Sequence, residues 1–276
     1  MAALLVATWS FAAVSCGNDD ERPVLRVGAD SSAESIVLAE IYSQALARTG
    51  TRTDVRTGLD TPVTDLDAGH ISVLPARNGE LVQRWNPGSA ARAPAEVAAA
   101  VNAALPQGLS VSDAADGADV RARLLVTEGF AEGEQVRAVD ELDCASLHAG
   151  VVEAPGFAET GPARIEGCSF AAQTRFTDVD GLRKALQDGI IQVGVVNGPP
   201  PVAAGLIVLD DQDYALRAQN VLALFRAGIF DRVEMKKLNY VAGELTTDGL
   251  VELIDRVEGG AEPADAARAW LDAHGL

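Results

Sequence analysis

Side chains able to carry out chemistry are few in this sequence and stand far apart. The three histidines, His70, His148 and His274, have no metal-ligand spacing. Motifs that mark phosphate loops, dinucleotide sites, serine hydrolases and zinc proteases (GxxxxGK[ST], GxGxxG, GxSxG and HExxH) do not occur. With 40 Asp and Glu residues, chance pairs of carboxylates are expected. The sequence therefore predicts neither an enzyme nor a site for a metal or another cofactor.

The first cysteine, Cys16, lies in a segment typical of exported lipoproteins. Residues 1–15 carry no charge and are too short to span a bilayer of about 30 Å as a helix, but they match a signal-peptide hydrophobic region. Small residues precede Cys16 and a polar run follows it, which resembles a lipobox. We expect residues 1–22 to be a signal peptide and tether, with lipidation on Cys16. No Lys or Arg precedes the apolar stretch, so either the start lies upstream or the signal is weak, and a buried N-terminal strand or helix is the alternative.

The other two cysteines, Cys144 and Cys168, are candidates for a disulfide. Export would place them in an oxidising compartment, where two cysteines in one lobe tend to pair. The bridge would close a loop of roughly 25 residues, which corresponds to about 3 kcal/mol in the chain-entropy model. Two unconnected buried thiols are the alternative.

Composition restricts the class of protein further. The chain has 276 residues, 48% of them apolar, which suffices for two lobes of domain size or one large α/β domain. The 22 Lys and Arg residues against 40 Asp and Glu residues give a formal charge of −18. A surface of this sign repels phosphate backbones, so we expect no nucleic-acid partner.

Apolar patterning predicts alternating strands and helices. Residues 24–28 fit a buried strand, Ser31 and Glu34 have capping-box spacing, and a helix follows to about residue 48. Further strands are expected at 53–57, 71–74, 124–127, 147–153, 168–171, 190–196 and 206–209. Helices are expected at 63–69, 78–85 and 94–104. Three more are expected after a capping box at Thr177–Asp180, after a cap at Thr246 or Thr247, and from Pro263. Such alternation predicts mostly parallel sheets, with crossovers between two lobes near 120–125 and 221–225.

Several stretches, taken in order, resemble the glycine betaine/choline/osmoprotectant-binding proteins of ABC importers. They are 27–35 with 38–46, then 66–75, then 186–196 with 206–211 and 218–221, and finally 238–239 with 245–250 and 269–276. The resemblance implies an α/β fold with two lobes, the Venus flytrap architecture of type 2 periplasmic binding proteins, with the ligand between them. Lobe I would comprise 23–122 plus 221–276, and lobe II 123–220. It also implies a monomer that hands a small molecule to ABC permease subunits, anchored by lipid at the outer face of the cytoplasmic membrane.

One motif departs from the family pattern. Where the family has Pro-Glu-[Tyr/Phe]-Thr-Gly, this chain has Pro75-Ala76-Arg77-Asn78-Gly79. Family members hold a quaternary ammonium in an aromatic cage by cation–π attraction, and a guanidinium at that position would repel the ligand. We therefore expect the cage to be lost. An orphan or sensory binding protein, or an enzyme of unrecognised type on the same fold, are the alternatives.

Seven residues are candidates for ligand contact: Ser31, Ser32, Asp60, Thr61, Arg77, Asn78 and Asn197. Arg77 would bind a carboxylate or phosphate, or else form a salt bridge. Ser31 and Ser32 would bind a polar group at a helix N-terminus, or cap that helix. The polar side chains of Asn78 and Asn197 would face the cleft or shape turns, and Asp60-Thr61 matches a family loop. Two aromatic residues, Trp85 and Phe157, would wall the pocket or pack in the core.

Overall fold

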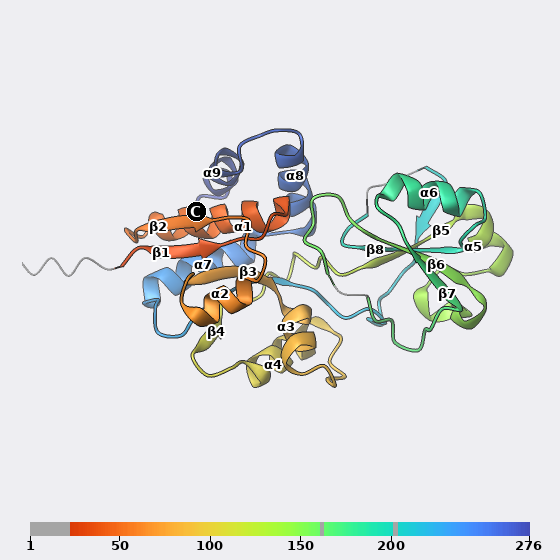
Figure 1. Cartoon of the computed structure of the whole chain (residues 1–276), viewed down its shortest axis with the longest axis horizontal. Helices are drawn as coiled ribbons and strands as arrows, with labels where there is room; N and C mark the ends of the chain where they lie inside the picture. The colour runs from red at the N-terminus through yellow and green to blue at the C-terminus, as the bar shows by residue number, and fades with distance from the viewer. Residues whose placement is uncertain (1–22, 161–162, 201–203) are drawn as a thin grey trace, which may run out of the picture.

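The computed structural model describes residues 23–160, 163–200 and 204–276, and these form two lobes side by side (Figure 1). The first lobe is built on a five-stranded sheet and the second lobe on another. The strands of the first sheet, in spatial order, are β2 (Thr53–Arg56), β1 (Leu25–Gly28), β3 (Val73–Arg77), β10 (Val221–Arg226) and β4 (Leu109–Val111). Those of the second are β7 (Ala172–Arg175), β6 (His148–Glu153), β8 (Val193–Asn197), β5 (Arg123–Thr127) and β9 (Leu206–Val208). The α/β fold with two lobes agrees with the expectation.

The sheets are mixed, whereas the sequence pattern predicted mostly parallel ones. Strand β1 is parallel to β2 and β3, but β10 is antiparallel to β3 and β4, and β5 is antiparallel to β8 and β9. Strands β5 and β10 are those through which the chain enters each lobe from the connecting segments. A parallel pairing needs a crossover that returns the chain to the same edge, and neither strand has one. Residues 221–225, expected as a crossover, belong instead to β10, inside the first sheet.

Helices cover the faces of the first sheet. On one face α1 (Ala33–Ala47) packs against α7 (Arg232–Glu244), α8 (Thr247–Glu258) and α9 (Pro263–Ala273). The helices α2 (Pro62–Ala68), α3 (Asn78–Trp85) and α4 (Pro94–Ala104) lie away from this group (Figure 1). Helix α7 was not predicted. The sequence does carry signals for this helix, since Asp231 and Glu234 form a capping box and the apolar residues Met235, Leu238, Val241 and Ala242 recur at helical spacing.

The second lobe has short helices, α5 (Glu128–Glu134) and α6 (Val179–Gln187). Helix α5 was missed because its sequence, EGFAEGE, contains two glycines, which are poor helix formers. It is stabilised by a cap, in which the Thr127 hydroxyl accepts a hydrogen bond from the Phe130 amide at 3.2 Å. The strand expected at 168–171 is formed four residues later, as β7.

Two helix starts lie one residue beyond their predicted caps. Ser32, not Ser31, caps α1, since its Oγ accepts from the Ser35 amide at 3.1 Å. Asp178, not Thr177, caps α6 by accepting from the Gly181 amide at 2.7 Å. The side chain of Glu34 is consequently not used in a capping box and is available for a distant partner.

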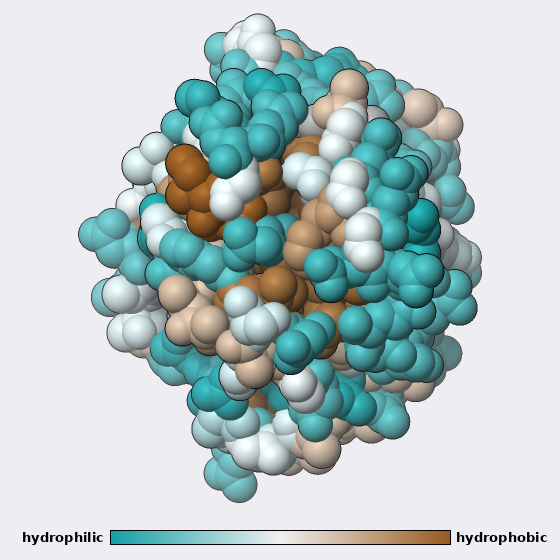
Figure 2. Space-filling view, turned by 90° about the vertical axis from the view of Figure 1, so that its right-hand side faces the viewer, coloured by the Kyte–Doolittle hydropathy of each residue, from teal (hydrophilic) through white to brown (hydrophobic). Residues whose placement is uncertain are grey.

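The predicted disulfide is confirmed, since Cys144 is bonded to Cys168. It joins the 3-10 turn Cys144–Ser146 to the segment that precedes β7. The end of the second lobe farthest from the first is mostly hydrophilic with small apolar areas (Figure 2). No helix within the described ranges is long and apolar enough to cross a membrane. Cys16 and its flanking signal lie outside the described residues.

Candidate functional site

A cavity of about 800 Å³ lies between the lobes. Its walls come from the start of α3 and the loop 87–92 in the first lobe, from Thr160, 163–173 and the end of β8 in the second, and from the connecting segment 215–219. Small-molecule sites occupy about 300–1,000 Å³ and favour domain interfaces. Because both lobes contribute walls, a ligand in this cleft would contact both at once.

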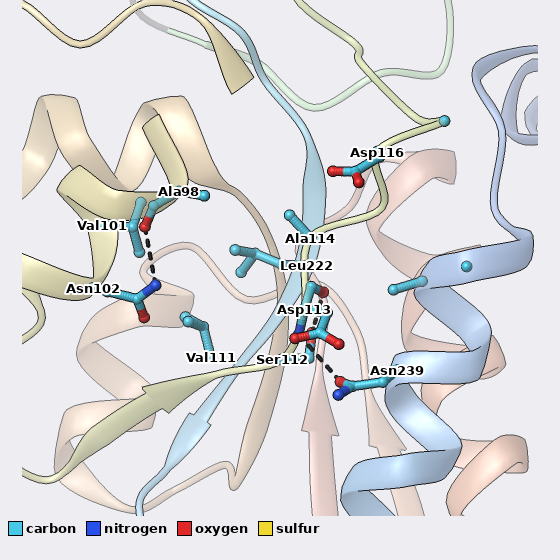
Figure 3. A pocket seen from close by; sticks show the side chains of 13 residues that line it. Ala98, Val101, Asn102, Val111, Ser112, Asp113, Ala114, Asp116, Leu222 and Asn239 are labelled. Atoms are coloured by element: carbon cyan, nitrogen blue, oxygen red, sulfur yellow. Dashed lines mark hydrogen bonds between the residues drawn. The ribbon is translucent and has the colours of Figure 1, made fainter. Parts of the chain in front are cut away.

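A second cavity of about 560 Å³ belongs to the first lobe alone (Figure 3). It lies between α4, the segment 111–117 and α7, and its polar walls are bonded to each other. Asn239 Oδ1 accepts from the Asp113 backbone amide at 3.1 Å, and the Asn102 side chain donates to Ala98 O at 3.0 Å. The cleft between the lobes is therefore the stronger candidate site.

A buried ion pair stands at the deep end of the cleft. Arg77 ends β3, and its Nε donates to Glu34 Oε1 at 3.0 Å while Nη2 contacts Oε2 of the same carboxylate. The two residues are only 6% and 3% exposed. Burial by itself lowers the pKa of Arg77, but the charge of Glu34 and its hydrogen bonds outweigh burial and hold that pKa above its ordinary value. Arg77 is thus a permanent cation that already has a partner.

The loop after β6 brings the second lobe onto this ion pair. The Glu34 amide donates to Gly156 O at 2.9 Å, and the Ala158 amide donates to Glu34 Oε2 at 2.9 Å. The Phe157 ring, buried in the core rather than in the cavity wall, has its centroid 5.8 Å from the Arg77 guanidinium carbon. Glu34 therefore connects the lobes as well as neutralising Arg77.

Gly156 is needed for this contact between the lobes. It has φ +73°, and a Cβ there would lie 2.4 Å from Ile254 Cγ2 on α8. We expect Gly156→Ala to displace the loop and destabilise the protein by about 1–3 kcal/mol, or roughly 2–12 °C in Tm. The matched control is Gly189→Ala, which has φ +70° but open space around the new methyl group. Equal shifts in thermal unfolding would show that backbone strain alone matters and that the loop contact is unimportant.

Glu80 lies one turn after Arg77 on α3 and faces the same cleft. Its Oε1 is buried without a hydrogen-bond partner, and Arg77 Nη1 is 3.6 Å away. Burial raises the pKa of Glu80; Arg77 opposes this, while Glu34, Glu153 and Asp30 add to it. Across the cleft, Asn197 at the end of β8 donates to Glu153 Oε1 at 2.9 Å. The deep end is therefore polar and rich in carboxylates.

Three arginines line the outer part of the cleft: Arg92, Arg164 and Arg217. Arg92 pairs with Glu166 at 3.3 Å. Arg217 donates to Ser89 O at 2.6 Å, to Ala91 O at 2.9 Å and to the Gln83 side chain at 3.5 Å, and Arg164 donates to Pro87 O at 3.4 Å. Burial and the nearby charge of Arg164 lower the pKa of Arg217. Sequence reasoning missed this group because its members stand far apart in the chain, each without a local motif.

The seven predicted ligand residues lie in different places. Arg77 and Asn197 line the cleft. Asn78 is fully buried and exchanges two hydrogen bonds with the Asn220 backbone, at 2.8 and 3.0 Å, which holds α3 to the start of β10. Ser32 caps α1 and donates to Asp30 Oδ1 at 2.6 Å. The exposed residues Ser31, Asp60 and Thr61 are not part of the cavity wall, so ligand contact by these residues stays a prediction.

Aromatic side chains contribute little to the cleft. Within the described part of the chain, Phe170 is the one aromatic residue in the cavity wall. Trp85 packs against the apolar cluster of the first lobe.

Two lobes, two connecting segments and a polar cleft between them define the class of two-lobed binding proteins. The chain belongs to the family described as the substrate binding domain of the ABC-type glycine betaine transport system, whose sequence profile matches residues 23–273. No match was found among proteins with curated descriptions.

Solved structures with this fold have low sequence identity to the chain. A glycine betaine/carnitine/choline ABC transporter structure is 17% identical, with a TM-score of 0.65, and covers 91% of this chain and 98% of its own. Apo YehZ from Escherichia coli is 18% identical, with a TM-score of 0.64 and coverage of 91% and 99%. Lactococcal OpuAC in its closed-liganded conformation with glycine betaine is 14% identical, with a TM-score of 0.53 and coverage of 91% and 96%. These likenesses establish the fold.

Proposed function

We propose that this protein is an exported, lipid-anchored solute-binding protein that captures a small polar compound in the cleft and delivers it to an ABC permease. The observation that carries the proposal is the cavity of about 800 Å³ walled by both lobes, in a chain of this family. We assign 23–122 with 221–276 to lobe I and 123–220 to lobe II, and we expect the protein to act as a monomer. It makes and breaks no bond of its ligand.

Closure of the lobes around the ligand is the expected motion. The two connecting segments meet in an antiparallel bridge between Asp119 and Asn220. The Asp119 carboxylate accepts from the Gln219 amide at 3.0 Å and from the Arg121 amide at 3.1 Å, so it holds the segments together. A ligand that contacts both lobes would favour the closed arrangement by its extra contacts there.

We infer further that the aromatic cage for a quaternary ammonium is lost. The support is Arg77, whose charge stands in the motif position of a cage aromatic, and the scarcity of aromatic residues in the cavity wall. A trimethylammonium group donates no strong hydrogen bond and is bound through aromatic faces. The solute should therefore belong to another chemical class.

Ligand screening by thermal unfolding of the soluble form, residues 17–276, tests the binding function. A compound at one hundred times its Kd stabilises by about 2.7 kcal/mol, which is roughly 5–10 °C in Tm for a chain near this size. The panel should contain quaternary amines, amino acids, sugars and small anions. A shift with one class supports solute binding, whereas no shift with any compound would favour an orphan or sensory binding protein.

The lipid anchor requires a separate test. We expect the full chain, expressed in a bacterial host, to take up labelled palmitate and to sediment with membranes. Cys16→Ser should abolish the label and release the protein. Labelling that persists in Cys16→Ser, or its absence from the unaltered chain, would contradict the anchor while leaving ligand binding unaffected.

A further inference from the structure

Charge is divided between two parts of the cleft wall. At the deep end, where Arg77 is buried, Arg77 faces the carboxylates of Glu34 and Glu80, and Asn197 is bonded to a third, Glu153, which also pairs with Arg175 at 3.5 Å. At the open end, guanidinium groups exceed carboxylates, because Arg92 alone of the three arginines has an acidic partner among the residues that the structure describes. A positive patch in a chain of charge −18 is not a consequence of its overall composition. The cleft thus has a negative deep end and a positive outer end.

The deep end lacks a hydrogen-bond donor. The Glu80 side chain is 42% exposed, but its Oε1 is buried and accepts no hydrogen bond, and Arg77 Nη1, 3.6 Å away, is too far to donate one. Buried acceptors are nearly always satisfied, because leaving them unpaired costs free energy. An N–H group of a bound cation, placed against the exposed part of the Glu80 side chain, would offset the carboxylate excess.

The outer end lacks an anion. Arg164 and Arg217 lie close enough for their charges to interact, and their hydrogen bonds go to neutral oxygens. Within the described residues, no carboxylate is in ion-pair distance of either guanidinium. Guanidinium groups bind carboxylates through short, charge-assisted hydrogen bonds. An acid group of a ligand is the partner that fits here.

Helix α3 sets the spacing between the two ends. Glu80 and Gln83 are three residues apart and both line the cavity, so they lie on one face of the helix, about one turn apart. Gln83 Oε1 in turn contacts Arg217 at 3.5 Å. A compact molecule with its two charges a few bonds apart can therefore reach from Glu80 to Arg217.

We infer that the cleft selects a small protic zwitterion, an amino acid or short amino-alkyl acid. Its primary or secondary ammonium donates to Glu80, and its carboxylate faces Arg217 and Arg164. This inference rests on the proposed solute-binding function. It excludes fully methylated amines, which have no N–H to donate.

Calorimetric titration of the soluble chain tests the inference with matched ligands. The probes are glycine, proline, β-alanine and γ-aminobutyrate, each beside its fully N-methylated form, its amine-free acid and its acid-free amine. We expect at least one protic zwitterion to bind, and its methylated, acid and amine analogues to bind at least tenfold more weakly. Binding of quaternary amines, sugars or simple anions alone would overturn the inference and keep the proposed function. Failure of every compound would count against both.

Single substitutions test which residues bind the ammonium and the carboxylate of the ligand. We expect Glu80→Gln to weaken binding of the zwitterion at least tenfold and Arg164→Gln by three- to tenfold. The control Asp265→Asn, at the exposed partner of Arg268 on α9 and outside the cavity wall, should leave the Kd within twofold. Since the side chain of Arg164 is exposed and makes one long hydrogen bond, its loss should leave folding intact even if Arg217→Gln does not fold. Unchanged affinity in both Glu80→Gln and Arg164→Gln would refute the proposed contacts of the ligand's ammonium with Glu80 and of its carboxylate with Arg164.

The pH dependence provides an independent readout. Protonation of Glu80 removes the charge that attracts the ammonium, so affinity should fall as pH is lowered. The fall should begin above the range of an ordinary carboxyl, because burial, with Glu34, Glu153 and Asp30, raises the pKa of Glu80 and Arg77 only partly opposes this. In Glu80→Gln this part of the pH profile of affinity should disappear.

The same substitution should not lower the Tm of the unliganded protein. A raised carboxyl pKa means that ionised Glu80 destabilises the unliganded fold at neutral pH. A clear fall in Tm would make the role of Glu80 structural.

Discussion

Replacing Arg77 by Met should lower the Tm of the protein by roughly 10 °C. The substitution leaves the Glu34 carboxylate 3% exposed with the Ala158 amide as its remaining donor and no guanidinium. Removing one partner of a buried ion pair costs about 3–5 kcal/mol, because the other charge stays buried and uncompensated, and each kcal/mol corresponds to roughly 2–4 °C in a chain near this size. Thermal or urea unfolding of the unliganded chain measures the effect.

A double variant separates charge from packing. In Arg77→Met with Glu34→Gln no buried charge remains, and the Gln carbonyl can still accept from Ala158. We expect the double variant to regain more than half of the stability lost in Arg77→Met, since a buried pair replaced by neutral groups of similar size is often nearly neutral in free energy. An Arg77→Met variant as stable as the unaltered protein would show that Arg77 is a free cleft cation and not the partner of Glu34.

Loss of the Cys144–Cys168 bridge should have the second largest effect. The bridge spans 24 positions, and the chain-entropy model assigns a loop of this length about 3 kcal/mol. We expect Cys144→Ala with Cys168→Ala to lower Tm by about 6–12 °C. A reductant should produce a similar change in the unaltered soluble chain and no further change in the double variant, which is the matched control.

The bridge should also affect ligand binding. Cys168 and its neighbours in 163–170 line the outer cleft, so freeing this segment loosens one wall of the site. Hydrogen exchange should increase in the second lobe and remain unchanged around α1 and α9 of the first. Protection that is lost equally in both lobes would show that the bridge stabilises the whole fold and not this wall in particular.

Local sequence signals determined much of the secondary structure. The helices at 78–85 and 94–104 were predicted at their observed bounds, because Pro94 fits a first helical turn and apolar residues recur with helical spacing. The pairing of Cys144 with Cys168 also followed from the sequence, through the compartment that the segment around Cys16 implied. The shifted cap at Ser32 shows the limit of such signals, since Ser31 and Ser32 are both suitable capping residues. Contacts with the rest of the folded chain decide which of the two caps α1.

The sequence by itself predicted the α/β class, the family likeness and the departure from the family motif at Arg77. Only the tertiary structure decided what Arg77 does, because its partner Glu34 lies 43 residues away and belongs to another element. It also brought Arg92, Arg164 and Arg217 together from three separate segments. Propensities and caps act over about four residues, whereas ion pairs and cavity walls depend on how distant elements pack. The secondary-structure elements could therefore be predicted from the sequence, whereas the distribution of charge in the cleft could not.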